Sequence, residues 1–103
     1  MTDGSEASAI ATIVERDGEP VVEVAGEVDL STAGQVEQAI AEVAARGVRV
    51  VVDLSAVAFL DSSGVTALLR SAKDHDIVLR EPSPAVTEVL AMAGLSDTLP
   101  IEG

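Results

Sequence analysis

The sequence predicts a single-domain α/β protein with a mixed β-sheet of four to five strands and helices packed against it. Short β-branched runs alternate with amphipathic helical runs in the order ββαβαβα(β), which implies parallel strands joined by right-handed crossovers. Residues 48–54 are almost continuously apolar, as expected of a central strand that needs helices on both sides or a second layer. We expect a flexible N-terminus over residues 1–8 and one domain over residues 9–103.

The first part of this domain predicts a β-hairpin. Residues 9–14 and 21–28 are rich in β-branched side chains, and the segment between them contains the turn-forming pair Asp17 and Gly18. Pro20 is expected to open the second strand, because proline is tolerated at the start of a strand.

After this hairpin, the period at which apolar residues recur changes from two residues to 3.6 residues, which predicts an amphipathic helix. Residues 32–35, Thr-Ala-Gly-Gln, match a capping box at its start, and Gly47 stands where the helix would stop. The predicted buried face consists of Val36, Ala39, Ile40, Val43 and Ala44.

A second helix is predicted after residues 61–64, and its pattern fades at residues 74–76. The predicted buried face consists of Val65, Leu68, Leu69 and Ala72.

The last part of the chain predicts a strand, a helix and an edge strand. Residues 77–79 form the short strand, and Ser83 with Pro84 reads as an N-cap followed by proline at the first helical position. Gly94 ends this helix, and residues 99–101 are the candidate edge strand. The predicted buried face of the helix consists of Val86, Val89, Leu90 and Ala93.

The composition excludes several classes of function. With 18 acidic and 6 basic side chains, the formal net charge is −12, and the few scattered cations cannot bind nucleic acid or an anionic membrane surface. The absence of cysteine excludes disulfides and thiol chemistry. No apolar run approaches the ~18 residues of a membrane span and no signal peptide is visible, so we expect a cytoplasmic protein. Phe59 is the only aromatic residue, which predicts a core of Val, Leu, Ile and Ala.

Ser62 is the most informative polar residue. It stands where a buried strand leads through a loop into a helix whose first turn carries two hydroxyls and a glycine. One interpretation is a simple helix N-cap, which stabilises a helix by ~0.5–2 kcal/mol. The other is a phosphate acceptor, because free N–H groups at the positive helix end favour an anion, although Asp61 would add like-charge repulsion.

Catalytic, metal and cofactor sites are not expected. The nucleophile-elbow motif is absent because Leu60 stands in place of its first glycine, and His75, the only histidine, would lie ~20 Å from Ser62 along one helix. The three adjacent side chains of Asp-His-Asp at residues 74–76 would point in different directions, which favours a solvated helix end over a metal site. Because the phosphate-loop and dinucleotide-binding glycine motifs are missing, we predict neither an enzyme nor a cofactor.

Asp29 allows two interpretations. It follows the predicted strand over residues 21–28 and precedes the first helix, where a carboxylate is favoured by the helix dipole. Alternatively, because loops that leave the same ends of parallel strands meet in space, Asp29 and Ser62 share one surface. The residue pattern leaves both interpretations open.

Five motifs occur in a characteristic order. They are Gly-Glu-Val-Asp at 26–29 with Thr32 and Ala33, a Val-rich strand ending in Asp-Leu-Ser at 53–55, Phe-Leu-Asp-Ser-Ser-Gly at 59–64, Ser-Pro-Ala-Val at 83–86, and Ala-Gly-Leu at 93–95. This ordered set resembles the STAS domain and, more narrowly, the bacterial anti-sigma-factor antagonists. The resemblance covers about residues 9–99.

The resemblance implies a mixed sheet with helices on one side and a function in partner switching. In that family the first serine of the Asp-Ser-Ser-Gly motif, here Ser62, is phosphorylated by a serine kinase that is itself the anti-sigma factor. The unphosphorylated antagonist captures this kinase and frees the sigma factor, and a serine phosphatase resets the cycle. The implied partner-binding residues beside the acceptor are Asp29, Thr32, Asp61, Ser63 and Gly64.

Two departures from the family pattern keep other interpretations open. The segment over residues 62–83 is about one helical turn shorter than usual and lacks a Gly-Gly pair, and no final helix is predicted before residue 103. Some short STAS proteins are non-phosphorylated subunits of ABC-type lipid or solvent transporters, although Ser62 favours the antagonist. A nucleotide-binding or scaffold STAS module is a third interpretation.

Overall fold

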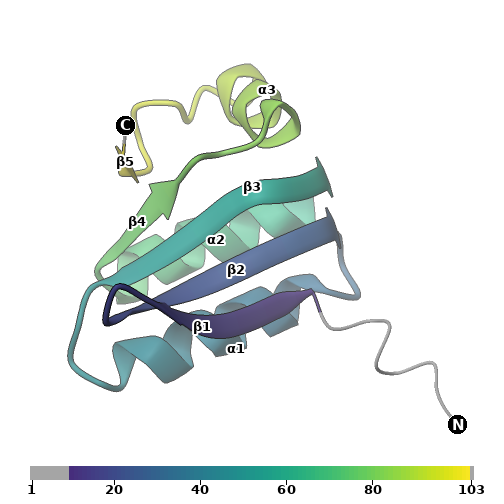
Figure 1. Cartoon of the computed structure of the whole chain (residues 1–103). Coiled ribbons are helices and arrows are strands. Elements are labelled where there is room, and N and C mark those ends of the chain that lie inside the picture. The colour runs from purple at the N-terminus through teal and green to yellow at the C-terminus, as the bar shows by residue number, and fades with distance from the viewer. Residues whose placement is uncertain (1–9, 103) are drawn as a thin grey trace, which may run out of the picture.

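The computed structural model describes residues 10–102, so the predicted flexible N-terminus at residues 1–8 lies outside the described part of the chain. Within that part, five strands form one sheet in the order β1-β2-β3-β4-β5 (Figure 1). β1 pairs with β2 antiparallel and the other pairs are parallel, which confirms the predicted mixed sheet. The strands are β1 (Ala11–Arg16), β2 (Glu19–Val28), β3 (Val50–Leu60), β4 (Ile77–Arg80) and β5 (Ile101–Glu102).

The predicted hairpin connects β1 and β2. Its two-residue loop consists of Asp17 and Gly18, with φ angles of +53° and +78°. Two consecutive positive φ angles define a type I′ turn, whose twist matches that of the flanking strands. The register that follows pairs Arg16 with Glu19.

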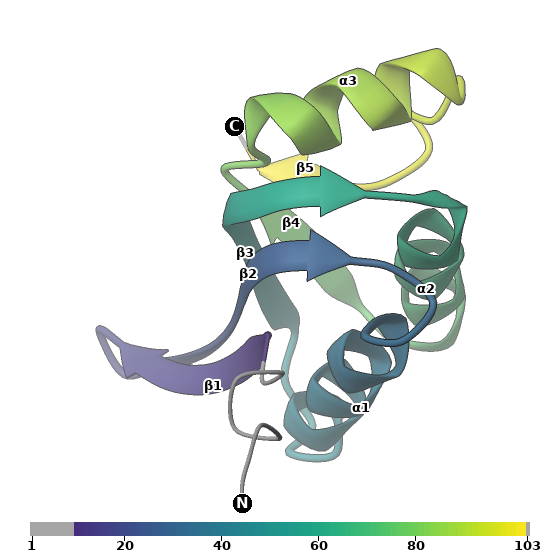
Figure 2. The same cartoon turned by 90° about the vertical axis from the view of Figure 1, so that its right-hand side faces the viewer.

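Two helices, α1 (Ala33–Ala44) and α2 (Ser62–Asp74), cover one face of the sheet. The third helix, α3 (Pro84–Met92), packs against β3 at the end of the molecule that is farther from β1 (Figure 2). The expectation of a helix or second layer on both faces of β3 is therefore wrong. Because side chains alternate along a strand, Val21 and Val51 lie on the opposite face, where they are nevertheless buried.

Ion pairs between strands close this helix-free face. Arg16 on β1 contacts Asp53 on β3 at 2.8 Å and also pairs with Glu23 on β2. Arg80 on β4 pairs with Glu19 at 3.4 Å. These ion pairs link β1, β2, β3 and β4 across the face that carries no helix.

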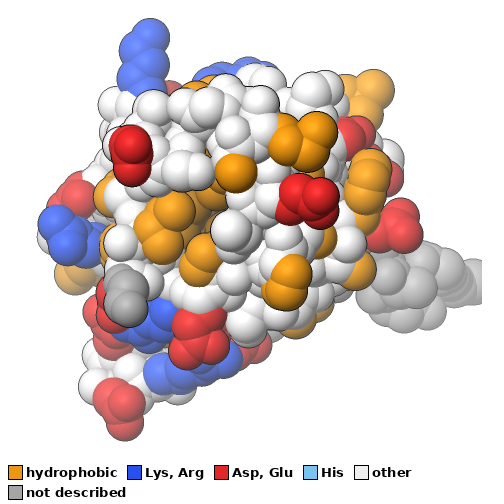
Figure 3. All heavy atoms as spheres, turned by 90° about the horizontal axis from the view of Figure 1, so that it is seen from above, with side chains coloured by type: hydrophobic (Ala, Val, Ile, Leu, Met, Phe, Trp, Pro, Cys, Tyr) orange, Lys and Arg blue, Asp and Glu red, His pale blue; other side chains and the backbone are white. Residues whose placement is uncertain are grey.

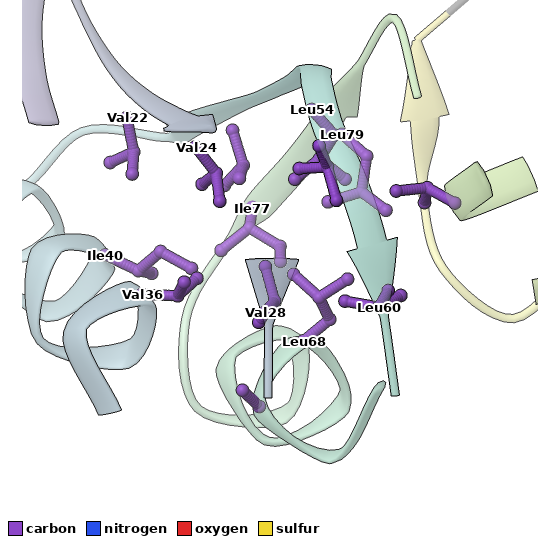
Figure 4. Packing of buried hydrophobic residues seen from close by; sticks show 14 of the residues in the cluster. Val22, Val24, Val28, Val36, Ile40, Leu54, Leu60, Leu68, Ile77 and Leu79 are labelled. Carbon is purple, nitrogen blue, oxygen red and sulfur yellow. The ribbon is translucent and has the colours of Figure 1, made fainter. Parts of the chain in front are cut away.

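The hydrophobic cluster between the sheet and the helices consists of Val, Leu, Ile and Ala side chains, as predicted (Figure 4). Phe59, the single aromatic residue, is 50% exposed. However, α2 turns a different face to the core from the one predicted, because small residues let it approach the sheet closely. Its buried residues are Gly64, Ala67, Leu68 and Ser71, while Val65, Leu69 and Ala72 are only partly buried.

The remaining boundaries follow the prediction with shifts in two strands, since β5 begins at Ile101 instead of residue 99 and β3 begins later than predicted. Ser83 caps α3, since its hydroxyl accepts from the Val86 N–H at 3.3 Å and donates to the Val57 carbonyl at 2.7 Å. Gly94 follows α3 with a φ of +73°, and β5 is the predicted edge strand. β3 begins at Val50, two residues later than predicted. It continues to Leu60, through the residues after Leu54 that were expected to form the loop before α2.

Candidate functional site at the ends of β2 and β3

β2 and β3 run parallel and end side by side, so that the loops leaving them lie at one edge of the molecule (Figure 2). Val28 is in register with Leu60, and the Asp61 N–H donates to the Val28 carbonyl at 3.1 Å. Asp29 directly follows the last residue of β2, and Ser62 is the second residue after the end of β3. The structure therefore brings the two predicted loops together.

Asp29 organises the β2–α1 loop. Its Oδ1 accepts from the Ser31 N–H at 3.0 Å and from the Ser31 hydroxyl at 2.8 Å. The Asp29 N–H donates to Thr32 Oγ1 at 2.9 Å, and that hydroxyl has Glu27 O at 2.9 Å and Asp29 Oδ1 at 3.1 Å as acceptors for its proton. The Ser31 hydroxyl bond is the largest influence and lowers the pKa of Asp29; desolvation opposes it, and Thr32 adds to the lowering.

The capping box predicted for α1 is absent. Thr32 is the N-cap residue of α1, but its side chain accepts no hydrogen bond from the helix. Its hydroxyl is engaged in the Asp29 loop instead. Gln35 Oε1 accepts from the Ile10 N–H at 3.0 Å, while the Thr32 N–H donates to the Asp29 carbonyl at 3.1 Å. Thr32 therefore stabilises the loop that carries Asp29.

Ser62 is the first residue of α2 and not its N-cap, which corrects the sequence interpretation. The N-cap is Asp61, whose Oδ1 accepts from the Ser63 N–H at 2.8 Å and from the Gly64 N–H at 3.2 Å. A carboxylate of the chain itself thus takes the helix N–H groups that were expected to receive a phosphate. Ser62 remains exposed on the first turn of the helix.

Gly64 lies on the buried side of the same turn. A Cβ atom at this position would collide with the Leu60 side chain and lie 2.9 Å from Val28 Cγ1. The absence of a side chain lets the first turn of α2 rest on the ends of β2 and β3. Gly64 is therefore a packing residue that positions Ser62.

Two open grooves flank Ser62, each of about 420 Å³. The α1–α2 groove includes Leu30 in its lining, and the α2–α3 groove includes Met92. Ser62 and Thr66 border both grooves, while Ser63 borders the first. Leu30 and Met92 were not predicted as site residues, although both are large apolar residues outside every predicted buried face.

His75 lies at the other end of α2, where it is the C-cap residue of a 13-residue helix. Such a helix spans ~20 Å, so the imidazole is not beside the Ser62 hydroxyl. Among residues 10–102, no group of three or more His, Cys, Asp or Glu side chains is placed to hold a metal ion. In the same part of the chain, no helix has the length and apolar character needed to cross a membrane. The site presents an exposed hydroxyl with Asp29 and Asp61 close by.

Residues 11–101 match the sequence model of a protein family described as Mlab, STAS domain. This chain belongs to the STAS domain family. The match covers nearly all of the described residues and confirms the resemblance carried by the ordered motifs. A comparison with curated protein sequences gave no match.

Solved structures similar to this STAS domain include anti-sigma-factor antagonists. One from Mycobacterium paratuberculosis is 34% identical, with a TM-score of 0.75 over 88% of this chain and 82% of that chain. The antagonist SpoIIAA in its unphosphorylated form is 25% identical, with a TM-score of 0.66 over 90% of this chain and 88% of that chain.

A third structure, the Bacillus cell fate determinant SpoIIAA in its phosphorylated form, is 23% identical. Its TM-score is 0.61, over 90% of this chain and 91% of that chain. At this identity the likeness concerns the fold alone, and it agrees with the single mixed sheet and three helices described above.

Proposed function

We propose that this STAS domain is an anti-sigma-factor antagonist that works by partner switching. The unphosphorylated domain captures an anti-sigma factor that is a serine kinase, and the sigma factor is released for transcription. Transfer of the γ-phosphoryl group of ATP to Ser62 Oγ, with ADP leaving and the hydroxyl proton passing to the kinase, ends this capture. A serine phosphatase restores the hydroxyl by hydrolysis. The exchange takes place in the cytoplasm, and the domain itself contacts neither nucleic acid nor membrane and catalyses no reaction.

The observation that carries this proposal is the exposed Ser62 on the first turn of α2, at the same edge as the Asp29 loop. The 34% identity to an anti-sigma-factor antagonist supports it. Gly64 acts by holding the helix turn in place. The residues proposed to contact the partner are Asp29, Thr32, Asp61 and Ser63.

The local charges suggest how one phosphate blocks the partner. A phosphoserine adds about −1.5 to −2 charges at pH 7. Because Asp61 already accepts from the Ser63 and Gly64 N–H groups, the phosphate on Ser62 stays outside the helix cap. Repulsion from Asp61 directs it away from the domain and toward the approaching partner. The block is therefore steric and electrostatic, with little change in the fold.

Phosphorylation by purified kinases tests the proposal. The full chain is incubated with Mg-ATP and each anti-sigma kinase encoded by the source genome. Trypsin cleaves after Arg49 and Arg70 and releases one peptide that carries Ser62, Ser63 and Thr66. Fragment-ion mass spectrometry should locate the phosphate on Ser62 alone. Phosphate on Ser63 or Thr66 would overturn the assignment.

Two variants serve as controls. Ser62→Ala should abolish labelling, whereas Ser63→Ala, which changes the adjacent hydroxyl, should retain it. Failure of every kinase to label the chain, together with co-purification of a transporter ATPase, would support the alternative of a non-phosphorylated subunit of an ABC-type lipid or solvent transporter.

A further inference from the structure

The two most exposed large hydrophobic side chains in residues 10–102 lie on either side of Ser62. Leu30, in the β2–α1 loop, is 84% exposed, and Met92, at the end of α3, is 81% exposed. Each lines one of the two grooves that Ser62 and Thr66 border. Figure 3, which looks down on the side that carries α3, shows hydrophobic side chains reaching the surface between acidic ones. Exposed apolar surface of this kind marks interaction sites when it is gathered in one place.

One carboxylate lines each of the two grooves. Asp61 borders the α2–α3 groove and Glu37 borders the α1–α2 groove, while Asp29 directly precedes Leu30. Among the described residues that line either groove, Arg70 is the one cation, and it lies 4.0 Å from Glu37. The surface therefore combines apolar anchors with an excess of negative charge.

We propose that Leu30 and Met92 are apolar anchors, which the anti-sigma kinase contacts on both sides of Ser62 with apolar side chains flanked by lysine and arginine. This inference rests on the proposed function, because the two anchors would supply the affinity of the domain for the anti-sigma kinase. Two anchors on opposite sides place the Ser62 hydroxyl near the centre of the interface, where water is excluded. A charge added at a desolvated centre weakens binding far more than a charge at a screened rim.

The charge of the chain favours this partner over a second copy of the domain. Two molecules with a net charge of −12 each repel one another. A symmetric contact through this surface would also place the same carboxylates opposite one another. A kinase surface with a positive potential is attracted by the same charges.

Glutamine substitutions test the anchors. Leu30→Gln and Met92→Gln change exposed side chains, so the fold should remain intact. Val48→Gln is the matched control, because Val48 is a 45% exposed hydrophobic residue that precedes β3, at the opposite end of that 11-residue strand from Ser62. Calorimetry measures the affinity of each full-length variant for the kinase that labels Ser62, with ADP in place of ATP. We expect each anchor variant to bind at least about five-fold more weakly, and the control to bind within about two-fold of the wild type.

The possible outcomes separate the anchors from the proposed function. If both anchor variants bind as the wild type does while Ser62 is still labelled, the anchors are wrong and the function stands. If no anti-sigma kinase binds the wild type, both are wrong. A wild-type dimer in sedimentation that Leu30→Gln converts to a monomer would assign this surface to self-association and overturn the inference.

Salt dependence tests the charge of the partner. The affinity of the wild type should fall as NaCl is raised from about 50 mM to about 300 mM, because the Debye length shortens. An affinity that does not change with salt would contradict a cationic partner surface.

Discussion

Gly64 lies in the first turn of α2, on the side that packs against the ends of β2 and β3. Because an added Cβ would collide with Leu60 and approach Val28, Gly64→Ala requires these side chains or the helix turn to shift. Overpacking of this kind costs ~1–3 kcal/mol in the free energy of unfolding. We expect that loss, together with slower phosphorylation of Ser62. Urea unfolding followed by circular dichroism measures the stability, since the chain has no Trp or Tyr.

Gly34 provides the matched control for this substitution. It lies in α1 and is exposed, and a Cβ there would meet nothing within 4 Å. Gly34 lies in the first turn of α1, so Gly34→Ala should stabilise the domain by at most the ~0.5–1 kcal/mol that is usual in a helix interior. If Gly64→Ala unfolds at the wild-type urea concentration, the close approach is not needed.

The lowered pKa of Asp53 predicts how the stability of the domain depends on pH. Burial raises its pKa, but hydrogen bonds from the Ser55 N–H and hydroxyl, together with Arg16, outweigh burial and lower the pKa below 3.8. A lowered native pKa contributes stability that is present above the unfolded value and is lost as the pH falls through the native value. Stability should therefore decline below about pH 5.

The decline is tested by urea unfolding at several pH values. Asp53→Asn should be less stable than the wild type at pH 7 and should lose less stability on acidification. Arg16→Met, which removes one of the three stabilising partners, should give an intermediate slope. An acid slope for Asp53→Asn equal to that of the wild type would show that this carboxylate does not contribute.

At the scale of the element, the start of α2 depends on Asp61. Its carboxylate accepts from two backbone N–H groups of the first turn. Asp61→Ala should destabilise the domain by ~0.5–2 kcal/mol, and Asp61→Ser, which keeps a capping oxygen, should restore most of the loss. Hydrogen exchange at the Ser63 and Gly64 amides should accelerate in the alanine variant alone. Unchanged exchange would place the cap elsewhere.

The elements also show what periodicity can predict. The hairpin, the three helices and the α3 cap follow from local signals, because turn and cap preferences depend on adjacent residues. The N-cap of α2 was misplaced by one residue, at Ser62 instead of Asp61, since Asp and Ser cap helices equally well. Of the predicted buried face of α2, Leu68 is fully buried. Gly64 and Ala67 were missed because they pack by close approach, which a pattern of large apolar residues does not reveal.

At the scale of the whole molecule, the structure confirms the predicted fold class. The sequence could predict it because the order of helices and strands permits few topologies. The helix-free face agrees with the family resemblance, but the apolar run at residues 48–54 did not predict it, since the contact of Arg16 with Asp53 joins residues 37 positions apart and depends on strand register. The shared edge of Asp29 and Ser62 was one of two interpretations that the residues left open, and it followed from the geometry of parallel strand ends. Leu30 and Met92 could not be predicted in this way, because their exposure depends on how the helices pack.

The most direct test of partner switching compares two states of one chain. The unphosphorylated domain and the domain fully phosphorylated at Ser62 are each titrated into the same anti-sigma kinase with ADP bound. We predict a loss of affinity of about 100-fold or more on phosphorylation, with an unchanged circular dichroism spectrum, while Ser62→Ala binds like the unphosphorylated domain. Equal affinities for the two states would contradict the switch at Ser62.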